Sequence, residues 1–147
     1  PKYRFEIYGE GNPIYKNELL ELIKSKKLQN NIFFMGGTSE IQRVFSEASI
    51  YVCTSKTESF GLTLIEAMGV GLPVISFDCP HGPKNIIHDG IDGYLIQNDS
   101  IVKASNAIIN LIEDKKLLVS MGNSARLNAQ RYHLDNVMKM WINLFNK

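Results

Sequence analysis

Ser55-Lys-Thr-Glu-Ser-Phe-Gly-Leu-Thr-Leu-Ile-Glu-Ala-Met-Gly-Val-Gly-Leu-Pro73 is the stretch that decides the fold of this chain. It follows a short apolar run at residues 50–53 and leads into another at residues 74–77. This order predicts a strand, a loop that carries Glu58, a short helix over about residues 61–70, and a second strand. Strands that alternate with helices in this way are typical of a parallel sheet buried on both faces.

The start of that helix is a predicted anion site. Gly61 has no Cβ, so a ligand can approach the backbone closely at this point. The N–H groups of the first helical turn have no partner within the helix, and they attract negative charge. Thr63 adds a hydroxyl to the same turn. Together these features predict a binding site for a phosphate group.

Two acidic residues flank the predicted anion site. Glu58 precedes the helix, and Glu66 lies one turn into it, where helical side chains lean back toward the N-terminus. A carboxylate is a poor phosphate ligand, but it accepts hydrogen bonds from both hydroxyls of a diol. A phosphate between two polyols describes a nucleotide-sugar. The alternative is an ordinary strand–loop–helix unit whose acids are solvated.

Residues 58–68, Glu-Ser-Phe-Gly-Leu-Thr-Leu-Ile-Glu-Ala-Met, resemble the E-x7-E signature of family 4 retaining glycosyltransferases, which have the GT-B architecture. The resemblance extends to Gly9-Glu-Gly11, Phe33-Phe-Met-Gly36, Gly71-Leu-Pro-Val74 and Asp89-Gly-Ile-Asp-Gly-Tyr-Leu-Ile96. It implies the α/β fold class: a Rossmann-like parallel sheet with flanking helices, as in the C-terminal half of a GT-B fold, and a helical C-terminal segment. Residues 1–147 would then form one nucleotide-sugar donor-binding domain, with the acceptor bound by an N-terminal domain outside this sequence.

The resemblance also implies roles for individual residues. Glu58 is the implied catalytic residue, because the acid at this position holds hydroxyls of the donor sugar near the reacting centre. Glu66 would bind the ribose. Gly9 would let the backbone approach the diphosphate, and Gly36 and Gly37 would line the base and ribose end. The other implied donor-binding residues are Ser59, Phe60, Gly61, Leu62 and Thr63.

The implied reaction transfers a hexose from a nucleoside diphosphate sugar to a glycan or lipid-linked acceptor, with retention, in bacterial surface polysaccharide synthesis. The loop at residues 79–83 resembles that of enzymes that use UDP-galactose or UDP-N-acetylgalactosamine, so a UDP-hexose is the expected donor. This donor is a substrate, and no cofactor is expected. His81 in that loop is read as structural or solvent-exposed rather than catalytic. Asn85 departs from the Glu that relatives commonly carry, so no role is carried over to it.

Two other readings are compatible with the pattern. One is a non-catalytic nucleotide-binding or subunit-docking module of the same fold, against which the intact Glu58 and Glu66 argue. The other is an epimerase or a sugar phosphorylase of similar architecture. A phosphorylase should carry a cofactor-lysine motif, which this sequence lacks.

Composition argues against several other classes. Sixteen basic and fifteen acidic residues give a net charge of +1, which lacks the basic footprint of a nucleic-acid-binding protein. The three His and two Cys show no metal-ligand spacing, which favours a metal-independent enzyme. Cys53 and Cys79 are expected to be reduced and buried, as in a cytoplasmic protein. No apolar run approaches the roughly 18 residues of a membrane span. If the full-length protein contacts a membrane, we therefore expect it to associate peripherally with the inner face of the plasma membrane.

Further expectations concern single elements. Residues 38–40 are expected to cap a helix that has acids in its first turn. Helices are also expected after Ser100, over about residues 114–131 and over about residues 134–145. The first of these is expected to pack through Ile101, Ser105, Ile108, Ile109 and Ile112. By resemblance the sheet has the strand order 3-2-1-4-5-6, with its first strand upstream of Pro1. Residues 1–147 alone are therefore expected to bind UDP weakly and to lack transferase activity.

Overall fold

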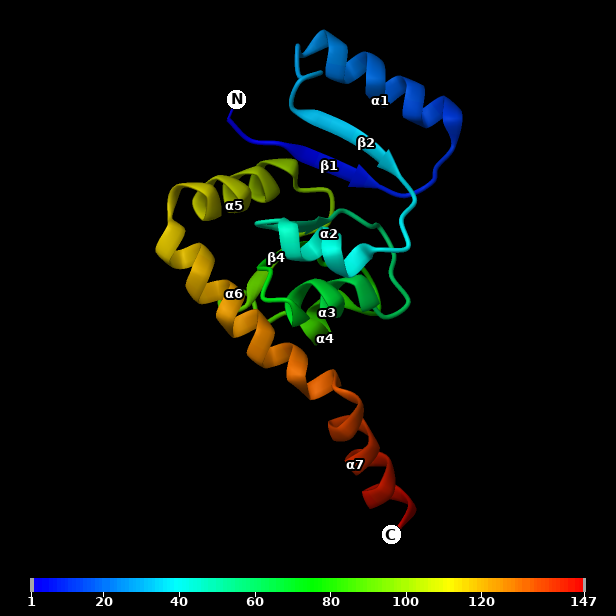
Figure 1. Ribbon diagram of the computed structural model, residues 1–147, viewed down its shortest axis with the longest axis vertical. Helices are drawn as coiled ribbons and strands as arrows, with labels where there is room; N and C mark the ends of the chain where they lie inside the picture. Colours follow the sequence, from blue (N-terminus) through cyan, green and yellow to red (C-terminus); the bar gives the residue numbers. More distant parts are fainter. Residues whose placement is uncertain (1, 147) are drawn as a thin grey trace. The chain divides into compact units, whose positions relative to one another are not determined.

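The computed structural model describes residues 2–146, which fall into two units, one ending at Ile41 and the other beginning at Gln42 (Figure 1). The first unit is a β–α–β segment. Strands β1 (Phe5–Tyr8) and β2 (Ile32–Gly36) are parallel neighbours, and helix α1 (Pro13–Ser25) connects them. The Asn12 side chain begins α1 by accepting a hydrogen bond from the Ile14 N–H at 2.8 Å. A proline follows at the first helical position, where a missing N–H costs nothing.

The second unit contains a three-stranded parallel sheet in the order β3-β4-β5. These strands are β3 (Tyr51–Cys53), β4 (Val74–Phe77) and β5 (Gly93–Ile96). Every residue of the central strand β4 is buried, as expected of a parallel strand that is covered on both faces. Cys53 lies opposite Ser76, so the carboxyl ends of β3 and β4 meet at one edge of the sheet.

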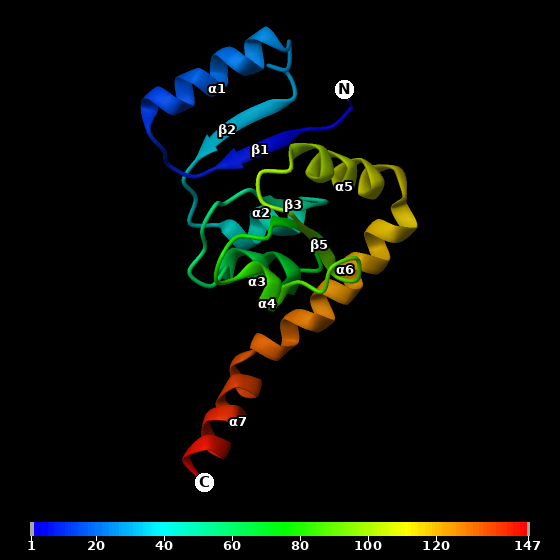
Figure 2. The ribbon, with the colours of Figure 1, turned by 180° about the vertical axis from the view of Figure 1, so that it is seen from behind.

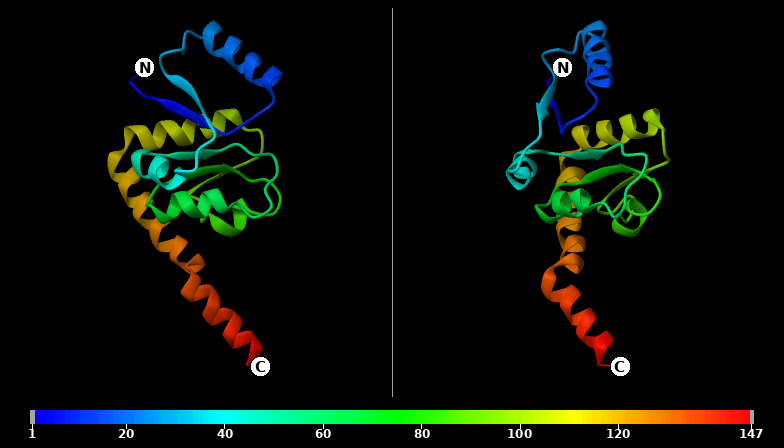
Figure 3. Two further views of the ribbon diagram at one scale, coloured as in Figure 1. Left: turned by 45° about the vertical axis from the view of Figure 1, so that its right-hand side comes forward. Right: turned by 90° about the vertical axis from the view of Figure 1, so that its right-hand side faces the viewer.

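Helices surround this sheet on both faces. Helix α2 (Ile41–Glu47) precedes β3, α3 (Leu62–Gly69) connects β3 to β4, and α4 (Pro83–Ile86) connects β4 to β5. After β5 the chain is helical and forms α5 (Ile101–Glu113), α6 (Lys115–Ala129), the 3-10 helix η1 (Gln130–Tyr132) and α7 (Leu134–Phe145). Figures 2 and 3 show α5 on one face of the sheet and α3 with α4 on the other.

One hydrophobic core cluster of the second unit lies between β4, β5, α5 and α6. It consists of Ile75, Phe77, Ile96, Ala104, Ala107, Leu111 and Met121. The expected packing face of α5 is therefore wrong in part, because Ile101 is 74% exposed and Ile109 is 47% exposed. Ile108 does pack against the core. The buried face of α5 carries Ala104, Ala107 and Leu111, and small side chains such as alanine allow a helix to pack close to a sheet.

Helix α2 also begins differently from the expectation. It starts at Ile41 and has no acidic residue in its first turn. The Thr38 hydroxyl oxygen instead accepts a hydrogen bond from the Glu40 N–H at 3.0 Å. This local turn uses residues 38–40 before the helix begins, as Ser and Thr often do near helix starts.

Helix α6 crosses the turn that follows α3 at a point where two backbones touch. Asp114 caps α6 by accepting hydrogen bonds from the N–H groups of Lys116 and Leu117 at 2.9 and 3.0 Å. A Cβ added to Gly122 would lie 2.3 Å from the carbonyl oxygen of Gly71. The crossing therefore requires glycine at position 122.

Helix α7 has the predicted bounds, and none of its residues is buried. Figure 1 shows it continuing beyond η1, away from the sheet of the second unit. The residues described, 2–146, contain two separate sheets, one of two strands and one of three. This is the grouping that the predicted strand order gives for this sequence, and the strand upstream of Pro1 stays a prediction.

Candidate functional site

Helix α3 starts directly after Gly61, as the sequence predicts. Gly61 has φ 96° and ψ 43°, a left-handed conformation that glycine adopts at little cost. The first backbone hydrogen bond of the helix runs from the Leu64 N–H to the Gly61 oxygen at 3.0 Å. The N–H groups of Leu62 and Thr63 thus come before the first N–H group that donates a hydrogen bond within the helix. The helix start has the predicted geometry, and anion binding by it stays a prediction.

The second acid of the motif lies on the exposed face of α3. Thr63 and Glu66 are both exposed and are one helical turn apart, so their side chains share one face. Leu64, Ala67 and Met68 occupy the buried face. The helix is therefore anchored by its apolar side, while Thr63 and Glu66 remain accessible to a ligand.

Glu58 lies in the loop between β3 and α3 and is partly buried. Its Oε1 atom is 3.8 Å from the sulfur of Cys53, the last residue of β3. The same sulfur is 3.5 Å from the Ser55 hydroxyl oxygen. The contact with Cys53 places the Glu58 carboxylate at the carboxyl edge of the sheet, which is where ligands bind in open α/β sheets.

Tyr51 links β3 to the first turn of α3. Its hydroxyl donates a hydrogen bond to the Thr63 hydroxyl oxygen at 3.1 Å, and its ring packs edge-on against Phe45 with the ring centroids 5.1 Å apart. The pKa of Tyr51 is raised to about 12, mainly by burial; the bond to Thr63 opposes this shift, and the nearby Cys53 and Glu58 contribute to it. Tyr51 therefore remains a protonated donor throughout the physiological range.

The loop after β4 packs directly against the loop that carries Glu58. A Cβ added to Gly82 would lie 2.5 Å from the Phe60 carbonyl oxygen and 3.4 Å from the Glu58 Cβ. Cys79, in the same loop, is buried, and this burial raises the pKa of its thiol. Cys53 and Cys79 are both free thiols. The role of Gly82 is not visible in the sequence: Pro-His-Gly-Pro signals a tight turn, but it does not say which loop the turn touches.

The C-terminal end of α4 is tied to η1. The Arg131 guanidinium donates hydrogen bonds to the carbonyl oxygens of Asn85 and Ile86 at 2.7 and 2.8 Å. The Tyr132 hydroxyl donates to the Asn85 oxygen at 3.2 Å, and its ring lies edge-on to Phe60 with the centroids 5.9 Å apart. These bonds satisfy the last carbonyls of α4, and here Asn85 contributes through its backbone.

A buried carboxylate, that of Asp92, stabilises the same region through hydrogen bonds. The Asp92 side chain is 1% exposed, and it accepts hydrogen bonds from the His88 backbone N–H at 2.8 Å and from the Asn128 side chain at 2.7 Å. Its Oδ2 atom is also 2.8 Å from His88 Nδ1. Asn128 donates a second bond to the Ile86 oxygen at 2.8 Å. Asp92 is therefore a structural residue that joins α6 to the segment after α4.

In the first unit, the predicted glycines lie at the carboxyl ends of the two strands. The Gly9 N–H donates a hydrogen bond to the Gly36 oxygen at 2.9 Å, and the two residues have φ values of 128° and 77°. The Gly37 N–H donates to Glu10 Oε1 at 3.4 Å. Gly9, Gly36 and Gly37 thus come together within this unit, along with Glu10, which the sequence analysis does not single out.

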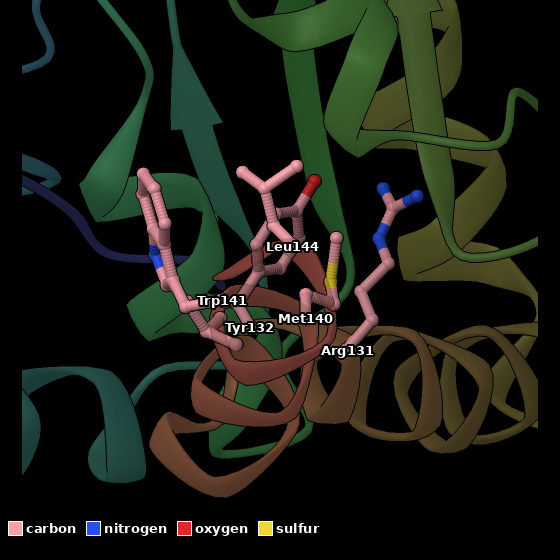
Figure 4. Close-up of a pocket in the computed structure, with 6 residues that line it drawn as sticks. Arg131, Tyr132, Met140, Trp141 and Leu144 are labelled. Atoms are coloured by element: carbon pink, nitrogen blue, oxygen red, sulfur yellow. The ribbon is translucent and has the colours of Figure 1, made fainter. Parts of the chain in front are cut away.

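A hollow of about 620 Å³ lies between η1 and α7 (Figure 4). It is lined by Arg131, Tyr132, Val137, Met140, Trp141 and Leu144. Four of these residues, Val137, Met140, Trp141 and Leu144, belong to α7. Neither Glu58 nor Glu66 lines this hollow, so it is separate from the candidate site.

Other candidate features have no part in this arrangement. His81 is exposed and has φ 72°. Within residues 2–146, no group of three His, Cys, Asp or Glu side chains is placed to hold a metal ion. None of the helices found in this described part of the chain has the length and apolar character needed to cross a membrane.

Residues 1–128 match the family described as glycosyl transferases group 1. The chain belongs to this family. This group 1 glycosyltransferase chain is 36% identical over 144 residues to the poly(ribitol-phosphate) alpha-N-acetylglucosaminyltransferase of Staphylococcus aureus (strain COL), covering 97% of this chain and 29% of the relative. It therefore spans less than a third of that protein's length.

Two solved structures of glycosyltransferases are similar to this chain. One is a mutant of S. aureus TarM in complex with Fondaparinux, alpha-GlcNAc-glycerol and UDP, with a TM-score of 0.86 and 36% identity over 98% of this chain and 29% of that one. The other is the C-terminal domain of the group 1 protein LpcC from Francisella tularensis, with a TM-score of 0.84 and 29% identity over 91% of this chain and 72% of that one. The predicted fold class, the C-terminal half of a GT-B glycosyltransferase, is confirmed.

Proposed function

We propose that this chain is the donor-binding domain of a retaining enzyme that transfers a hexose from a UDP-hexose to a glycan or lipid-linked acceptor. The observation that carries the proposal is the start of α3, where Gly61 opens the helix between Glu58 and Glu66. The similarity to a TarM mutant solved with UDP supports the nucleotide. The similarity to an enzyme named for transfer to poly(ribitol phosphate) supports a role in bacterial surface polymers. With a lipid-linked acceptor, the full-length protein would work at the cytoplasmic face of the plasma membrane.

In this proposal the N–H groups of Leu62 and Thr63 bind the diphosphate. The bond from the anomeric carbon to the diphosphate oxygen breaks, and its electron pair leaves with the diphosphate. The acceptor oxygen then bonds to the same face of the sugar, and its proton passes to the departing diphosphate. Because negative charge grows on the departing group, fixed N–H donors stabilise the transition state more than the ground state. Glu58 would hold hexose hydroxyls and Glu66 the ribose diol, and neither a metal nor a cofactor has a step in this scheme.

The identity of the donor can be tested on the full-length protein. The loop at residues 79–83 favours a galactose-type donor, whereas the S. aureus relative is named for N-acetylglucosamine. Release of UDP should therefore be measured with four donors: UDP-galactose, UDP-glucose and the two N-acetylated forms. Competition among UDP, GDP and ADP completes the test. Turnover of one UDP-hexose with tightest binding of UDP is expected, and preference for GDP or ADP would refute the UDP donor.

The role of Glu58 is tested by Glu58→Gln in the same protein. We expect turnover to fall about 10- to 100-fold, as for loss of hydrogen bonds to a charged group, with the affinity for bare UDP nearly unchanged, since the partner of Glu58 is the hexose. The exposed Glu113 in α5 provides a matched control as Glu113→Gln. If turnover and UDP affinity fall together, Glu58 holds the nucleotide instead. UDP binding by the unaltered protein without turnover of any donor would favour the non-catalytic nucleotide-binding module.

A further inference from the structure

Cys53 ends β3 with its side chain beside the loop that carries Glu58. The residue is 6% exposed, and its sulfur lies 3.8 Å from Glu58 Oε1. Among residues 2–146, this thiol is the one donor hydrogen-bonded to the Glu58 carboxylate. A thiol is a weak donor, but the charge of the acceptor strengthens the bond. The low exposure of Cys53 limits competition from water.

Gly82 belongs to the neighbouring loop, which packs against the loop that carries Glu58. Its backbone lies so close to the Glu58 loop that an added Cβ would come within 3.4 Å of the Glu58 Cβ and 2.5 Å of the Phe60 oxygen. Glu58 is therefore held at one carboxylate oxygen by the thiol, in a loop that packs against the loop of Gly82. A carboxylate held at one oxygen presents its other oxygen in a defined direction.

We propose that Cys53 is a positioning residue for Glu58. Its thiol holds Oε1, so that Oε2 is presented to the hydroxyls of the donor hexose. This inference rests on the proposed function, because it concerns how Glu58 meets the hexose. The thiol has a single proton, and the Ser55 oxygen at 3.5 Å is the other acceptor that the structure places within its reach.

The test uses three substitutions of Cys53 in the full-length protein. Cys53→Ala removes the donor, Cys53→Val removes it while filling the space with a residue suited to a strand, and Cys53→Ser keeps a hydroxyl donor. We expect kcat to fall about three- to tenfold in the Ala and Val variants, as for loss of one hydrogen bond. The KM for the UDP-hexose and the Kd for UDP should stay near the wild-type values. Cys53→Ser should recover most of the wild-type kcat.

Val74→Ala is the matched control. Val74 is also fully buried in the same sheet, but it lies at the amino end of β4, away from the Glu58 loop. It should leave kcat unchanged. Unchanged kcat in Cys53→Ala and Cys53→Val, with an active wild type, would overturn the positioning role and leave the proposed function intact. An equal loss in the Ala, Val and Ser variants would also overturn it, because packing would then explain the loss. A wild type that turns over no UDP-hexose would refute the proposed function itself.

Discussion

Glu66 is exposed one turn into α3, where its carboxylate can reach back toward the start of the helix. We expect Glu66→Ala in the full-length protein to weaken UDP binding by about 1–3 kcal/mol, the range for losing charge-assisted hydrogen bonds. Isothermal titration calorimetry with UDP measures this directly, with Glu113→Ala as the control. Unchanged affinity in Glu66→Ala would remove Glu66 from the nucleotide site.

Because of Tyr51, the stability of the second unit is expected to depend on pH in the alkaline range. Its pKa is about 12 in the folded chain against an ordinary 10, so the folded state holds the phenolic proton more tightly than the unfolded state does. The associated stability is complete below pH 10 and is lost as the pH rises through 12. Wild type should therefore lose about 2 kcal/mol more than Tyr51→Phe across this window.

Urea unfolding of the two proteins at a series of pH values between 10 and 12 checks this expectation. Tyr15→Phe is the control, since Tyr15 is 61% exposed. Parallel pH curves for wild type and Tyr51→Phe would show that the Tyr51 hydroxyl is not shielded as described.

Sequence reasoning found some residues of the candidate site and missed others for a physical reason. The roles of Glu58, Gly61 and Glu66 can be predicted from the sequence, because they depend on the spacing of these residues within one loop and one helix. Cys53 and Gly82 are not readable in the same way, because their contacts depend on how separate segments pack. The tight turn around Gly82 is visible in the sequence, and the loop that it touches is not.

At the scale of elements, the loop after β4 packs on the loop that carries Glu58. This packing makes Gly82 sensitive to substitution. Gly82→Ala would place a Cβ 2.5 Å from the Phe60 oxygen, which is backbone and cannot rotate away. We expect a loss of stability of about 1–3 kcal/mol, as for overpacking, together with lower turnover because the Glu58 loop must move. Thermal unfolding and UDP-hexose turnover of the full-length protein measure the two effects.

Gly69 supplies the matched control for this substitution. A Cβ at this end of α3 meets nothing within 4 Å, so Gly69→Ala should leave the stability equal or slightly higher. Equal melting temperatures for Gly82→Ala and Gly69→Ala would show that the two loops are not in the contact described here.

The elements themselves were predicted with uneven success. Strand β4 and helix α7 have the predicted bounds, because a short apolar run and a long amphipathic pattern are strong local signals. The packing face of α5 was predicted from its isoleucines, but the helix packs through Ala104, Ala107 and Leu111. Side-chain hydrophobicity favours the large residues, whereas close approach to the sheet favours the small ones, and a sequence does not show which effect prevails.

At the scale of the whole molecule, the edges of β1 and β3 suggest that the sheet continues. Within residues 2–146, β1 pairs with β2 alone, and β3 pairs with β4 alone. Unpaired backbone groups in a sheet that should be buried are costly, so we expect a further strand to pair with these edges. We predict that residues 1–147, expressed alone, unfold at low temperature, bind UDP weakly and show no transferase activity.

Calorimetric unfolding and UDP titration of residues 1–147, compared with the full-length protein, provide the measurement. The similar Francisella domain is a longer chain, since this sequence covers 72% of it. A fragment with a sharp unfolding transition and the UDP affinity of the full-length protein would contradict the prediction, because it would show that no further strand is needed.

The contact between Gly122 and Gly71 also limits recombination between relatives. A Cβ added at position 122 would lie only 2.3 Å from the Gly71 carbonyl oxygen and 3.4 Å from the Pro73 ring, so a relative with a side chain at this position needs a different backbone path. A chimera can take α3 and the turn after it from one parent and α6 from another. The two sides of the contact between Gly71 and Gly122 then come from different proteins and need not fit each other. Crossover points placed after Gly122 keep both sides of this contact from one parent, whereas crossovers between Pro73 and Gly122 separate them.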